Sequence, residues 1–452
     1  MRFSGRPAFA FLFAVASLVV RANADLKGVF GHYLIGSLGD ASEAIKDVQD
    51  AKQMGLDAFA LNVQDATAPF ATNAIQLLFS AAESNDFKLF FSFDMTTLND
   101  PSTFIPLLLQ YQSSSAYYLH ENRPFVSTFD GGNVAFGQST PNQGWQTQFI
   151  DVLANSGVKP FFVPDFDDFN NQLGGTYDAQ FFQDFPVVDG VFSWESAWPE
   201  VPEGHVNVSS AKDQTGLTNA RAAGKVYMMP LSSFQFKHID ANQNFYRLGG
   251  LNLAQRIGQV LELQPDFVEI ITWNDSGESH FIGNIFPEPI AGSPAIQAYA
   301  DGFNHTAWQN VLAPFIVAYK NGATSAADVT SFGAFAGAFW YRPLLLTAQC
   351  ASDPLGKPDG AQNAVDELSF AVLLPADSTG VTVRVSSGGN VVATFPTTPG
   401  LNAATVPIQL GAQRVELVGA DGSVIGAGDG TKDVVGETDG VCNFNYEVAD
   451  IS

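Results

Sequence analysis

The segment Thr272–His280 is where side chains able to do chemistry lie closest together in the sequence. Two carboxylates, Asp275 and Glu278, are separated by two residues, one of which is Gly277. Glycine permits a tight turn there, so both carboxylates can face one cavity and divide into a proton donor and a base. The alternative is a polar loop in which Asp275 caps a helix. An indole, an amide and an imidazole accompany the pair, from Trp273, Asn274 and His280.

Other polar side chains directly follow apolar runs, where the active site of a parallel-strand barrel is built. They are His32, Asn62, Asp65, Asp94, Asp130, Asp165, Asp167, Asp168, Glu195, Lys237 and His238. Aromatic residues accompany them at Tyr33, Trp194, Trp198, Phe234 and Trp273. A single Asp after a strand is more often a helix cap. Several carboxylates in one aromatic-lined cleft, however, are what cleavage of a glycosidic bond requires.

The elements that must position these side chains alternate along most of the chain. Short runs rich in Val, Ile and Phe alternate with longer amphipathic segments up to about Tyr319, which is typical of parallel strands joined by helices. One such helix is expected to start after Ser42 and to end at Gly55. Eight strands, the number in a (β/α)8 TIM barrel, are expected at residues 28–35, 58–63, 89–93, 125–129, 160–164, 190–194, 226–231 and 267–273.

After about Arg342 the composition changes to Val, Thr, Ser and Gly, and helical patterns vanish. Short strands separated by turns are expected at residues 371–374, 381–385, 391–395, 405–410, 414–418 and 423–425. Such a series predicts an all-β sandwich. The expected organisation is therefore a signal peptide at residues 1–24, a catalytic barrel at 25–335 and a C-terminal β-sandwich at 336–452.

The N-terminus has the features of a secretory signal peptide. Arg2 and Arg6 precede the apolar run Ala8–Val20, and Ala22–Ala24 provides a cleavage site. The run is too short to span a membrane, so we expect a secreted, extracellular monomer. Cleavage removes three arginines and changes the formal net charge from −25 to −28. This charge disfavours nucleic acid and anionic lipid as partners and suits a neutral substrate.

Export would also allow the cysteines to form a disulfide and asparagines to be glycosylated. The chain has two cysteines, Cys350 and Cys442, and an even count in an exported protein favours one disulfide over two free buried thiols. Asn207 and Asn304 begin glycosylation motifs in polar stretches and are expected to carry glycans. Asn274 begins a third such motif but lies in the candidate site, where we expect it to form hydrogen bonds instead.

Several stretches together resemble glycoside hydrolase family 71, the fungal α-1,3-glucanases or mutanases. They are Trp273–His280, Val29–Tyr33, Asp57–Asn62 and Phe91–Met95. Their order and spacing resemble the family from about residue 28 to residue 321, and the combination is specific although each piece alone is weak. The C-terminal region, from about residue 342, is covered only loosely.

The resemblance implies a hydrolase of α-1,3-glucan that inverts anomeric configuration and needs neither cofactor nor metal. Its catalytic residues would be Asp275 and Glu278, with Asp94 as a further essential carboxylate. We assign Glu278 as the acid and Asp275 as the base. Inversion requires carboxyl groups about 6.5–9.5 Å apart; if the pair lies closer, Asp94 becomes the alternative partner from across the barrel mouth. The sugar is expected to contact His32, Tyr33, Asn62, Trp194, Trp198, Trp273, Asn274 and His280.

Three other functions compete with this interpretation. A metal hydrolase could bind zinc between His32, His280 and Asp275, but the six histidines show no short metal-site spacing. A carbohydrate-binding or wall-structural barrel would keep the cleft without turnover, against which the intact carboxylate pair argues. A Ser-His-Asp esterase would need a Gly-x-Ser-x-Gly turn, which is not evident. The choice between endo and exo action depends on loop lengths and stays open.

Overall fold

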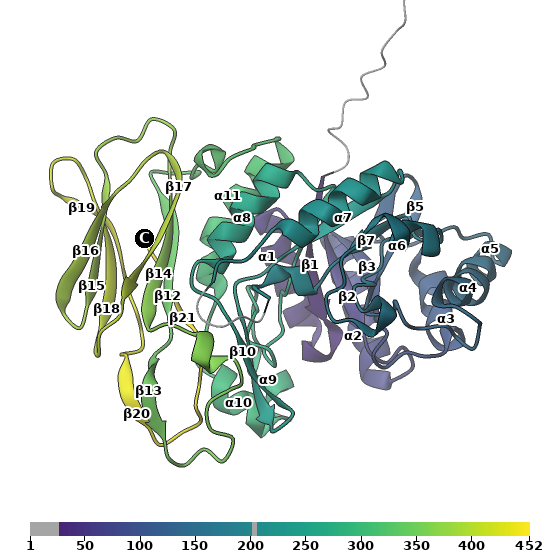
Figure 1. Ribbon diagram of the computed structural model, residues 1–452, viewed down its shortest axis with the longest axis horizontal. Helices are drawn as coiled ribbons and strands as arrows, with labels where there is room; N and C mark the ends of the chain where they lie inside the picture. The colour runs from purple at the N-terminus through teal and green to yellow at the C-terminus, as the bar shows by residue number, and fades with distance from the viewer. Residues whose placement is uncertain (1–26, 201–205) are drawn as a thin grey trace, which may run out of the picture.

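The computed structural model describes residues 27–200 and 206–452, so the expected signal peptide lies outside the described residues. Eight parallel strands dominate the larger part of the molecule (Figure 1). They are β1 (Gly28–Leu34), β2 (Ala58–Val63), β3 (Lys88–Asp94), β5 (Arg123–Phe129), β6 (Phe161–Phe162), β7 (Gly190–Phe192), β8 (Val226–Leu231) and β11 (Phe267–Ile270). A short strand, β4 (Leu119–His120), pairs antiparallel with β5.

The strands close on themselves into a barrel. Parallel pairing runs in the order β6, β5, β3, β2, β1, β11, β8, β7. Two backbone hydrogen bonds cross the remaining gap between β6 and β7: Asp189 donates to Phe162 (2.8 Å), and Phe192 donates to Pro164 (2.9 Å). The prediction of eight parallel strands is thus confirmed, although β6 and β7 are only two and three residues long.

The barrel interior is filled by aromatic rings at the level where the strands start. Side chains alternate along a strand, so Phe30 of β1 points inward. Its ring centroid lies 4.9 Å from that of Phe90, 5.5 Å from that of Phe125 and 5.5 Å from that of Phe267, which come from three other strands. Polar residues replace the rings only toward the carboxyl ends of the strands, which places the candidate site there.

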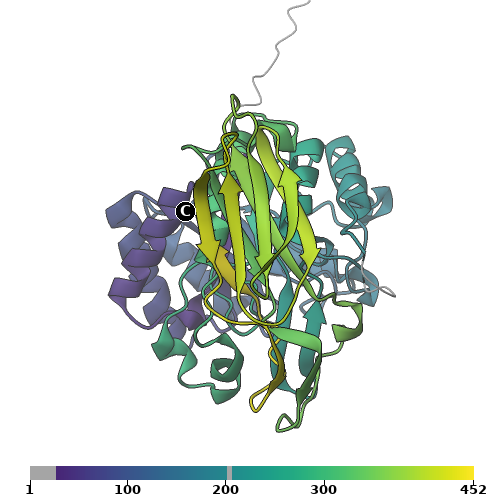
Figure 2. The same ribbon diagram turned by 90° about the vertical axis from the view of Figure 1, so that its left-hand side faces the viewer.

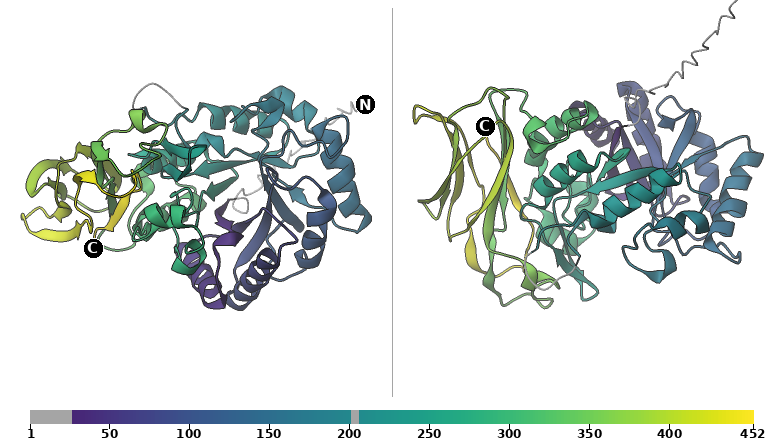
Figure 3. Two further views of the ribbon diagram at one scale, coloured as in Figure 1. Left: turned by 90° about the horizontal axis from the view of Figure 1, so that it is seen from below. Right: turned by 45° about the horizontal axis from the view of Figure 1, so that its top comes forward.

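Helices cover the outside of the strands (Figure 3). In α1 (Ala41–Met54), Asp40 and Glu43 form a capping box, and Gly55 ends the helix with φ 98°. The expected end is therefore confirmed, while the expected start at Ser42 is wrong because the Asp40 side chain accepts the first free N–H groups. The others are α2 (Pro69–Asn85), α3 (Pro101–Tyr111), α4 (Pro141–Gly144), the π-helical η3 (Trp145–Ile150), α5 (Asp151–Asn155), α6 (Ala179–Asp184), α7 (Ala211–Ala222), α8 (Asn252–Leu263), α9 (Pro287–Ile290), α10 (Pro294–Ala300) and α11 (Gln309–Lys320).

An antiparallel hairpin that the sequence did not predict follows β8. It consists of β9 (Gln235–Asp240) and β10 (Gln243–Arg247). Most residues of β9 are polar, so the apolar run expected of a barrel strand is missing. The hairpin projects from the carboxyl end of its barrel strand and is therefore available to the site.

The C-terminal part consists of two antiparallel sheets and a small parallel pair, β13 with β20 (Figure 2). Two four-stranded sheets, in the orders β17-β14-β12-β21 and β16-β15-β18-β19, share an apolar core that includes Phe339, Phe370, Val385 and Leu417. All six expected strands are present. The strands are β12 (Ala336–Tyr341), β13 (Leu344–Cys350), β14 (Glu367–Leu374), β15 (Thr382–Ser387), β16 (Asn390–Pro396), β17 (Gly400–Pro407), β18 (Gln413–Val418), β19 (Val424–Asp429), β20 (Val435–Thr438) and β21 (Glu447–Asp450).

The barrel and the C-terminal sheets share a buried boundary. Trp308, which precedes α11, lies 5.9 Å from Trp340 of β12, measured between ring centroids. The indole N–H of Trp340 donates to the Gly250 carbonyl (2.8 Å), and the Tyr246 and Tyr446 hydroxyls lie 2.8 Å apart. Large aromatic side chains thus join the two parts as they would inside one core.

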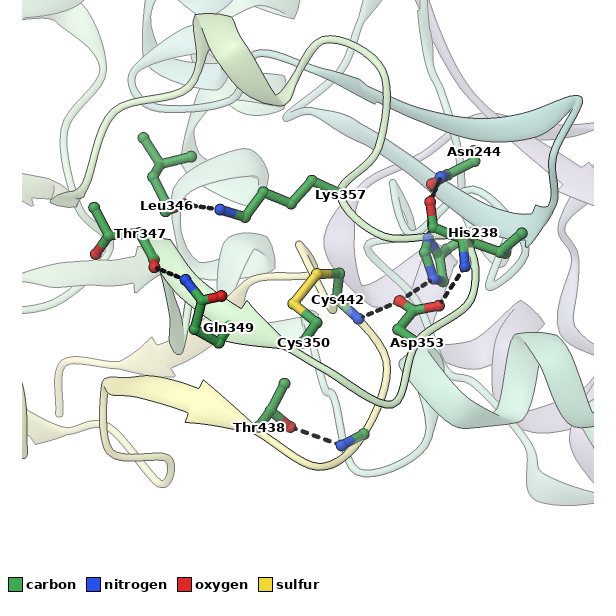
Figure 4. The surroundings of a disulfide bond; sticks show 12 residues. His238, Asn244, Leu346, Thr347, Gln349, Cys350, Asp353, Lys357, Thr438 and Cys442 are labelled. Carbon is green, nitrogen blue, oxygen red and sulfur yellow. Dashed lines mark hydrogen bonds and ion pairs between the residues drawn. A yellow bond between two sulfur atoms is a disulfide. The ribbon is translucent and has the colours of Figure 1, made fainter.

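The disulfide between Cys350 and Cys442 is present, as the sequence predicted (Figure 4). The backbone N–H of Cys442 donates to Asp353 Oδ2 (2.7 Å), and the same oxygen lies 2.9 Å from Nε2 of His238 on β9. Asn244 of β10 contacts the other ring nitrogen of His238 at 2.7 Å. The disulfide region is therefore tied directly to the hairpin of the barrel.

The two expected glycan acceptors are exposed, and their glycosylation stays a prediction. Asn207 accepts a hydrogen bond from the side chain of Gln255 (2.8 Å), and Asn304 accepts one from the backbone of Thr306 (2.9 Å). Asn274 is only 1% exposed and forms hydrogen bonds, as expected. Within residues 27–200 and 206–452, no helix combines the length and the apolar character needed to cross a bilayer.

Replacing both cysteines with serine should destabilise the protein. The disulfide closes a loop between residues separated by 92 positions, and closure of such a loop stabilises by about 4–5 kcal/mol in the chain-entropy description. Urea unfolding should show this loss for Cys350→Ser/Cys442→Ser, while added reductant should change the wild type but not the double variant. Equal unfolding midpoints for variant and wild type would contradict the stabilising role.

Candidate active site

The loop that carries the two candidate catalytic carboxylates is fixed to the end of β1. The Asn274 side chain accepts from the Leu34 N–H (2.8 Å) and donates to the Leu34 carbonyl (3.1 Å). The backbone N–H of Trp273 donates to the His32 carbonyl (2.7 Å). Both amide atoms of Asn274 are thereby used on backbone, so the expectation that it contacts sugar is wrong. Its role is to hold the loop over the barrel.

Asp275 and Glu278 converge on one imidazole. Asp275 Oδ2 lies 3.6 Å and Glu278 Oε2 lies 3.5 Å from Nε2 of His280. The His280 side chain has no exposed surface, whereas those of Asp275 and Glu278 are 13% and 19% exposed. His280 therefore lies beneath the two carboxylates and does not present itself to a sugar, which corrects its expected role as a contact residue.

The turn between the carboxylates is held by Asp275 itself. Its Oδ1 accepts from the backbone N–H of Glu278 (2.8 Å), and its own N–H donates to the Thr272 hydroxyl (2.9 Å). The left-handed residue in this loop is Ser279, with φ 62°. The absence of a side chain at Gly277 instead leaves room for Asp275, because a Cβ there would lie 3.2 Å from Oδ1.

The spacing of the pair differs from the value expected for inversion. One oxygen of Asp275, one oxygen of Glu278 and a ring nitrogen of His280 all lie within 4.8 Å of one another. The acid and the base of inverting glycosidases are about 6.5–9.5 Å apart. The structure therefore brings the two carboxylates together but closer than the mechanism implied by the resemblance requires.

Two side chains from the unpredicted hairpin hold Glu278. Lys237 Nζ lies 3.1 Å from Oε1, and the side-chain amide of Gln235 donates to Oε2. Burial acts to lower the pKa of Lys237, but the charge of Glu278 and the hydrogen bond to it prevail, and its pKa is raised. Lys237 stands out in the sequence as a charge after an apolar strand; no sequence signal marks Gln235.

Opposing influences also act on Asp275. Burial acts to raise its pKa, but the contact with His280 at 3.6 Å and the charge of Lys237 prevail, and the pKa of Asp275 is lowered. Since a lowered pKa keeps a carboxyl group ionised in mildly acidic solution, Asp275 is suited to accept a proton.

A buried contact between a histidine and a glutamate lies inside the barrel below this loop. Nδ1 of His32 is 2.6 Å from Oε1 of Glu269, and both side chains are at most 2% exposed. Oε2 of Glu269 has no hydrogen-bond partner among the described residues. Trp194 contacts the His32 ring edge-on, with centroids 4.8 Å apart. Sequence reasoning missed Glu269, although a charged residue within a buried apolar strand is itself an informative signal.

The zinc set of the competing interpretation, His32, His280 and Asp275, does not come together among the described residues, because His32 is engaged by Glu269. Among the described residues, two groups are close enough to share a cation: the pair Asp275 and Glu278 with His280, and a second group of three aspartates. The first group offers one nitrogen and two oxygens, fewer nitrogen ligands than most protein zinc sites have.

That second group, Asp130, Asp165 and Asp167, follows the carboxyl ends of the fourth and fifth barrel strands, β5 and β6, and its ligand atoms lie within 4.8 Å of one another. Burial, followed by the charges of neighbouring acids such as Asp168, raises the pKa of Asp130 to about 7. Burial and the charge of Glu195 raise the pKa of Asp167 to about 7, and burial and Asp167 raise that of Asp165 well above its usual range.

Two of the expected aromatic contact residues lie outside the barrel mouth. Tyr33 is fully buried, and its hydroxyl donates to Asp47 of α1 (2.9 Å). Trp273 is also fully buried and packs against Phe59, with ring centroids 5.1 Å apart. Tyr33 is next to inward-facing His32 on the strand, so alternation turns it toward the helices. The expectation that Tyr33 and Trp273 bind sugar is therefore wrong.

The remaining expected contact residues are at the mouth. Trp194 and Trp198 are 6% and 2% exposed, with ring centroids 6.0 Å and 5.8 Å from that of His280. Arg247 of the hairpin covers Trp198 at 4.9 Å. Asn62, on the inward face of β2, and Asp94, at the end of β3, are 5% and 4% exposed. Their contacts with sugar stay predictions.

The aspartate cluster should make stability depend on pH. Unfolding returns Asp130 and Asp167 to an ordinary pKa near ~4, so between about pH 4 and 7 the unfolded chain releases protons that the folded chain keeps. Their contribution is therefore complete below pH ~4 and is lost as pH rises through 7. Asp275 has the opposite effect on stability: because its pKa is lowered, it stabilises the folded protein above pH ~4.

We expect the Tm to fall from pH 5 to pH 7.5 and the fall to be smaller in Asp130→Asn/Asp167→Asn. Asp184→Asn, at an exposed position, should keep the wild-type slope. Scanning calorimetry at several pH values checks this, and a wild-type Tm that rises over that range would contradict the role of the cluster.

Comparison with known proteins connects this site to a family. The profile of glycosyl hydrolase family 71 matches residues 25–452. Glucan endo-1,3-alpha-glucosidase agn1 of Schizosaccharomyces pombe is 33% identical over 437 residues, covering 95% of this chain and 96% of that protein. The ascus wall endo-1,3-alpha-glucanase of the same yeast is 28% identical, covering 94% and 98%. A mutanase of Penicillium rubens is 29% identical, covering 93% and 88%.

These matches extend over the barrel, the carboxylate loop and the C-terminal sheets together. The chain is therefore an enzyme, a glycoside hydrolase, and it belongs to glycosyl hydrolase family 71.

Proposed function

We propose that the chain hydrolyses α-1,3-glucosidic bonds of α-1,3-glucan, with Asp275 and Glu278 as the acid–base pair. The observation that carries this proposal is the convergence of both carboxylates over the buried His280 at the barrel mouth. The names of the relatives supply the substrate, and two of them also indicate cleavage within the chain rather than at its end.

We assign Asp275 as the base that activates water and Glu278 as the proton donor. The lowered pKa of Asp275 keeps it ionised, and Glu278 is the more exposed of the two, which suits contact with the leaving oxygen. The amide of Gln235 donates to Glu278, and its own oxygen has no partner among the described residues. A half-turn of that amide lets its oxygen accept a hydrogen bond from the O–H of protonated Glu278, so Gln235 can hydrogen-bond Glu278 in both protonation states.

The short spacing of the pair gives Asp94 a specific alternative role. Asp275 and Glu278 have oxygens within 4.8 Å of each other. If water cannot fit between Asp275 and the sugar, the base must be a carboxylate that lies farther than this from Glu278. Asp94 lies at the carboxyl end of β3, and its Oδ1 accepts from the backbone N–H of Thr96 (3.1 Å). Under this alternative Asp94 activates the water, and Asp275 has an electrostatic role as the negative charge beside His280.

The remaining parts of the proposal concern the surroundings of the site. His32, Asn62, Trp194 and Trp198 would contact sugar rings as they enter the mouth. The chain would be secreted after cleavage behind Ala24 and act as a monomer, without a cofactor. The C-terminal sheets would form a β-sandwich domain that begins near residue 336.

Removing either carboxylate should abolish hydrolysis without unfolding the protein. Asp275→Asn, Glu278→Gln and Asp94→Asn should each lower kcat about 10²–10⁴-fold, the usual worth of a general acid or base. Release of reducing sugar from insoluble α-1,3-glucan, beside α-1,4- and β-1,3-glucan, measures this, and EDTA should have no effect. Asp65→Asn changes an exposed strand-end acid and serves as the control. Retained activity in both Asp275→Asn and Glu278→Gln would remove the mechanism.

Chemical rescue and product stereochemistry should separate the roles. Glu278→Ala should still cleave an α-1,3-linked oligosaccharide with fluoride as leaving group, because fluoride needs little protonation. Azide should restore turnover to the variant that lacks the base, so rescue of Asp94→Ala rather than Asp275→Ala would assign Asp94 as the base. Proton NMR of the wild-type reaction should show the β-anomer first, and the α-anomer first would contradict inversion.

A further inference from the structure

We propose that a hollow at the rim of the barrel mouth binds glucose units of the α-1,3-glucan beside the bond that is cleaved, with Phe70 as the face on which a sugar ring stacks. The hollow lies between η2 (Ile35–Ser37), the end of β2 and the first turn of α2. This inference rests on the proposed function and adds a binding site to it.

The size and chemistry of the hollow suit a neutral sugar. Its volume is about 350 Å³, which falls within the usual range of small-molecule sites. None of the residues that line it is charged, although the chain as a whole carries a formal net charge of −25. An ionic ligand would leave its charge unpaired there, whereas a glucose unit needs only hydrogen bonds and an apolar surface.

Phe70 supplies the apolar surface. The buried face of α2 consists of other residues, among them Ala71, Ala74 and Ile75, and Phe70 is 58% exposed at the start of the helix. Gly36 lies beside the ring: a Cβ at this position would be 3.9 Å from it and would meet no other atom within 4 Å. The lack of a side chain at Gly36 thus leaves the ring uncovered.

Asn62 and Gln64 supply hydrogen-bonding groups to the lining of the hollow. Neither side-chain amide has a hydrogen-bond partner among the described residues, and Asn62 is only 5% exposed. Each amide offers donors and an acceptor to sugar hydroxyl groups. A ring stacked on Phe70 would thereby be bound both by its face and by its edge.

One residue links the wall of the hollow to the catalytic loop. Leu34 lines the hollow, and its backbone N–H and carbonyl are both bonded to the side chain of Asn274, the neighbour of Asp275. A glucan chain with a bond at Asp275 can therefore extend over Leu34 toward Phe70. The hollow is placed to bind the part of the substrate that lies outside the reacting unit.

Two variants test this site in different ways. Phe70→Ala removes the stacking face, and Gly36→Val covers it while Phe70 stays in place. Both should raise KM for long α-1,3-linked oligosaccharides about tenfold, equivalent to about 1.4 kcal/mol, and leave the rate on the shortest cleaved substrate unchanged. Phe70→Trp should retain wild-type KM. Phe332→Ala removes a 70% exposed ring that lines other hollows and is the matched control.

Binding without turnover keeps the test independent of the proposed activity. Calorimetric titration of an α-1,3-linked glucose oligosaccharide into Glu278→Gln should show about tenfold weaker binding when Phe70→Ala or Gly36→Val is added. Equal affinity with and without these changes, or no binding at all, would overturn the site. Failure of the proposed function would instead appear as a wild-type enzyme that does not cut α-1,3-glucan.

Discussion

Two carboxylates within 4.8 Å of each other must have their mutual repulsion offset, and the structure of this site follows from that requirement. The compensation comes from below, through the buried imidazole of His280, and from the side, through Lys237 on the hairpin. Neither group is in the barrel sheet itself. The barrel positions the site, whereas the loop after β11 and the hairpin after β8 supply the side chains that offset the repulsion between the two carboxylates.

The opposite side of the mouth shows the reverse arrangement. No Lys, Arg or His side chain of the described residues pairs with Asp130, Asp165 or Asp167, and burial raises the pKa values of these three aspartates. One side of the mouth therefore favours an ionised Asp275, and the other favours protonated carboxyl groups. A sugar between them would meet acceptors on one side and hydroxyl donors on the other, which is an arrangement that can orient it.

The repetitive parts of the structure were predictable from the sequence. Strands such as β2 and β8 are continuous apolar runs, and their bounds match the expected ones. The hairpin was not predictable, because the alternation in β9 mixes polar residues that bind Glu278 with residues that pack. The side on which a residue points was also hard to predict at strand ends: Tyr33 and His32 are neighbours, yet only one faces the barrel interior.

Asn274 shows a further limit of sequence reasoning. Its position next to Asp275 suggested contact with substrate, but both of its amide atoms hold Leu34. An amide that ties a loop and an amide that binds sugar look the same in a sequence, since only the available partners distinguish them. The carboxylate pair was easier to identify because two carboxylates, an indole, an amide and an imidazole fall within the nine residues Thr272–His280.

The link from Cys442 through Asp353 to His238 bears on how the two parts of the enzyme could be separated. His238 is one residue from Lys237, so the strand that steadies the catalytic glutamate is itself anchored to the last third of the chain. A binding module on a flexible tether can be exchanged or lost while the catalytic unit keeps working. Here the C-terminal part supports the hairpin that binds the catalytic glutamate. The barrel and the C-terminal part would therefore have to be inherited together.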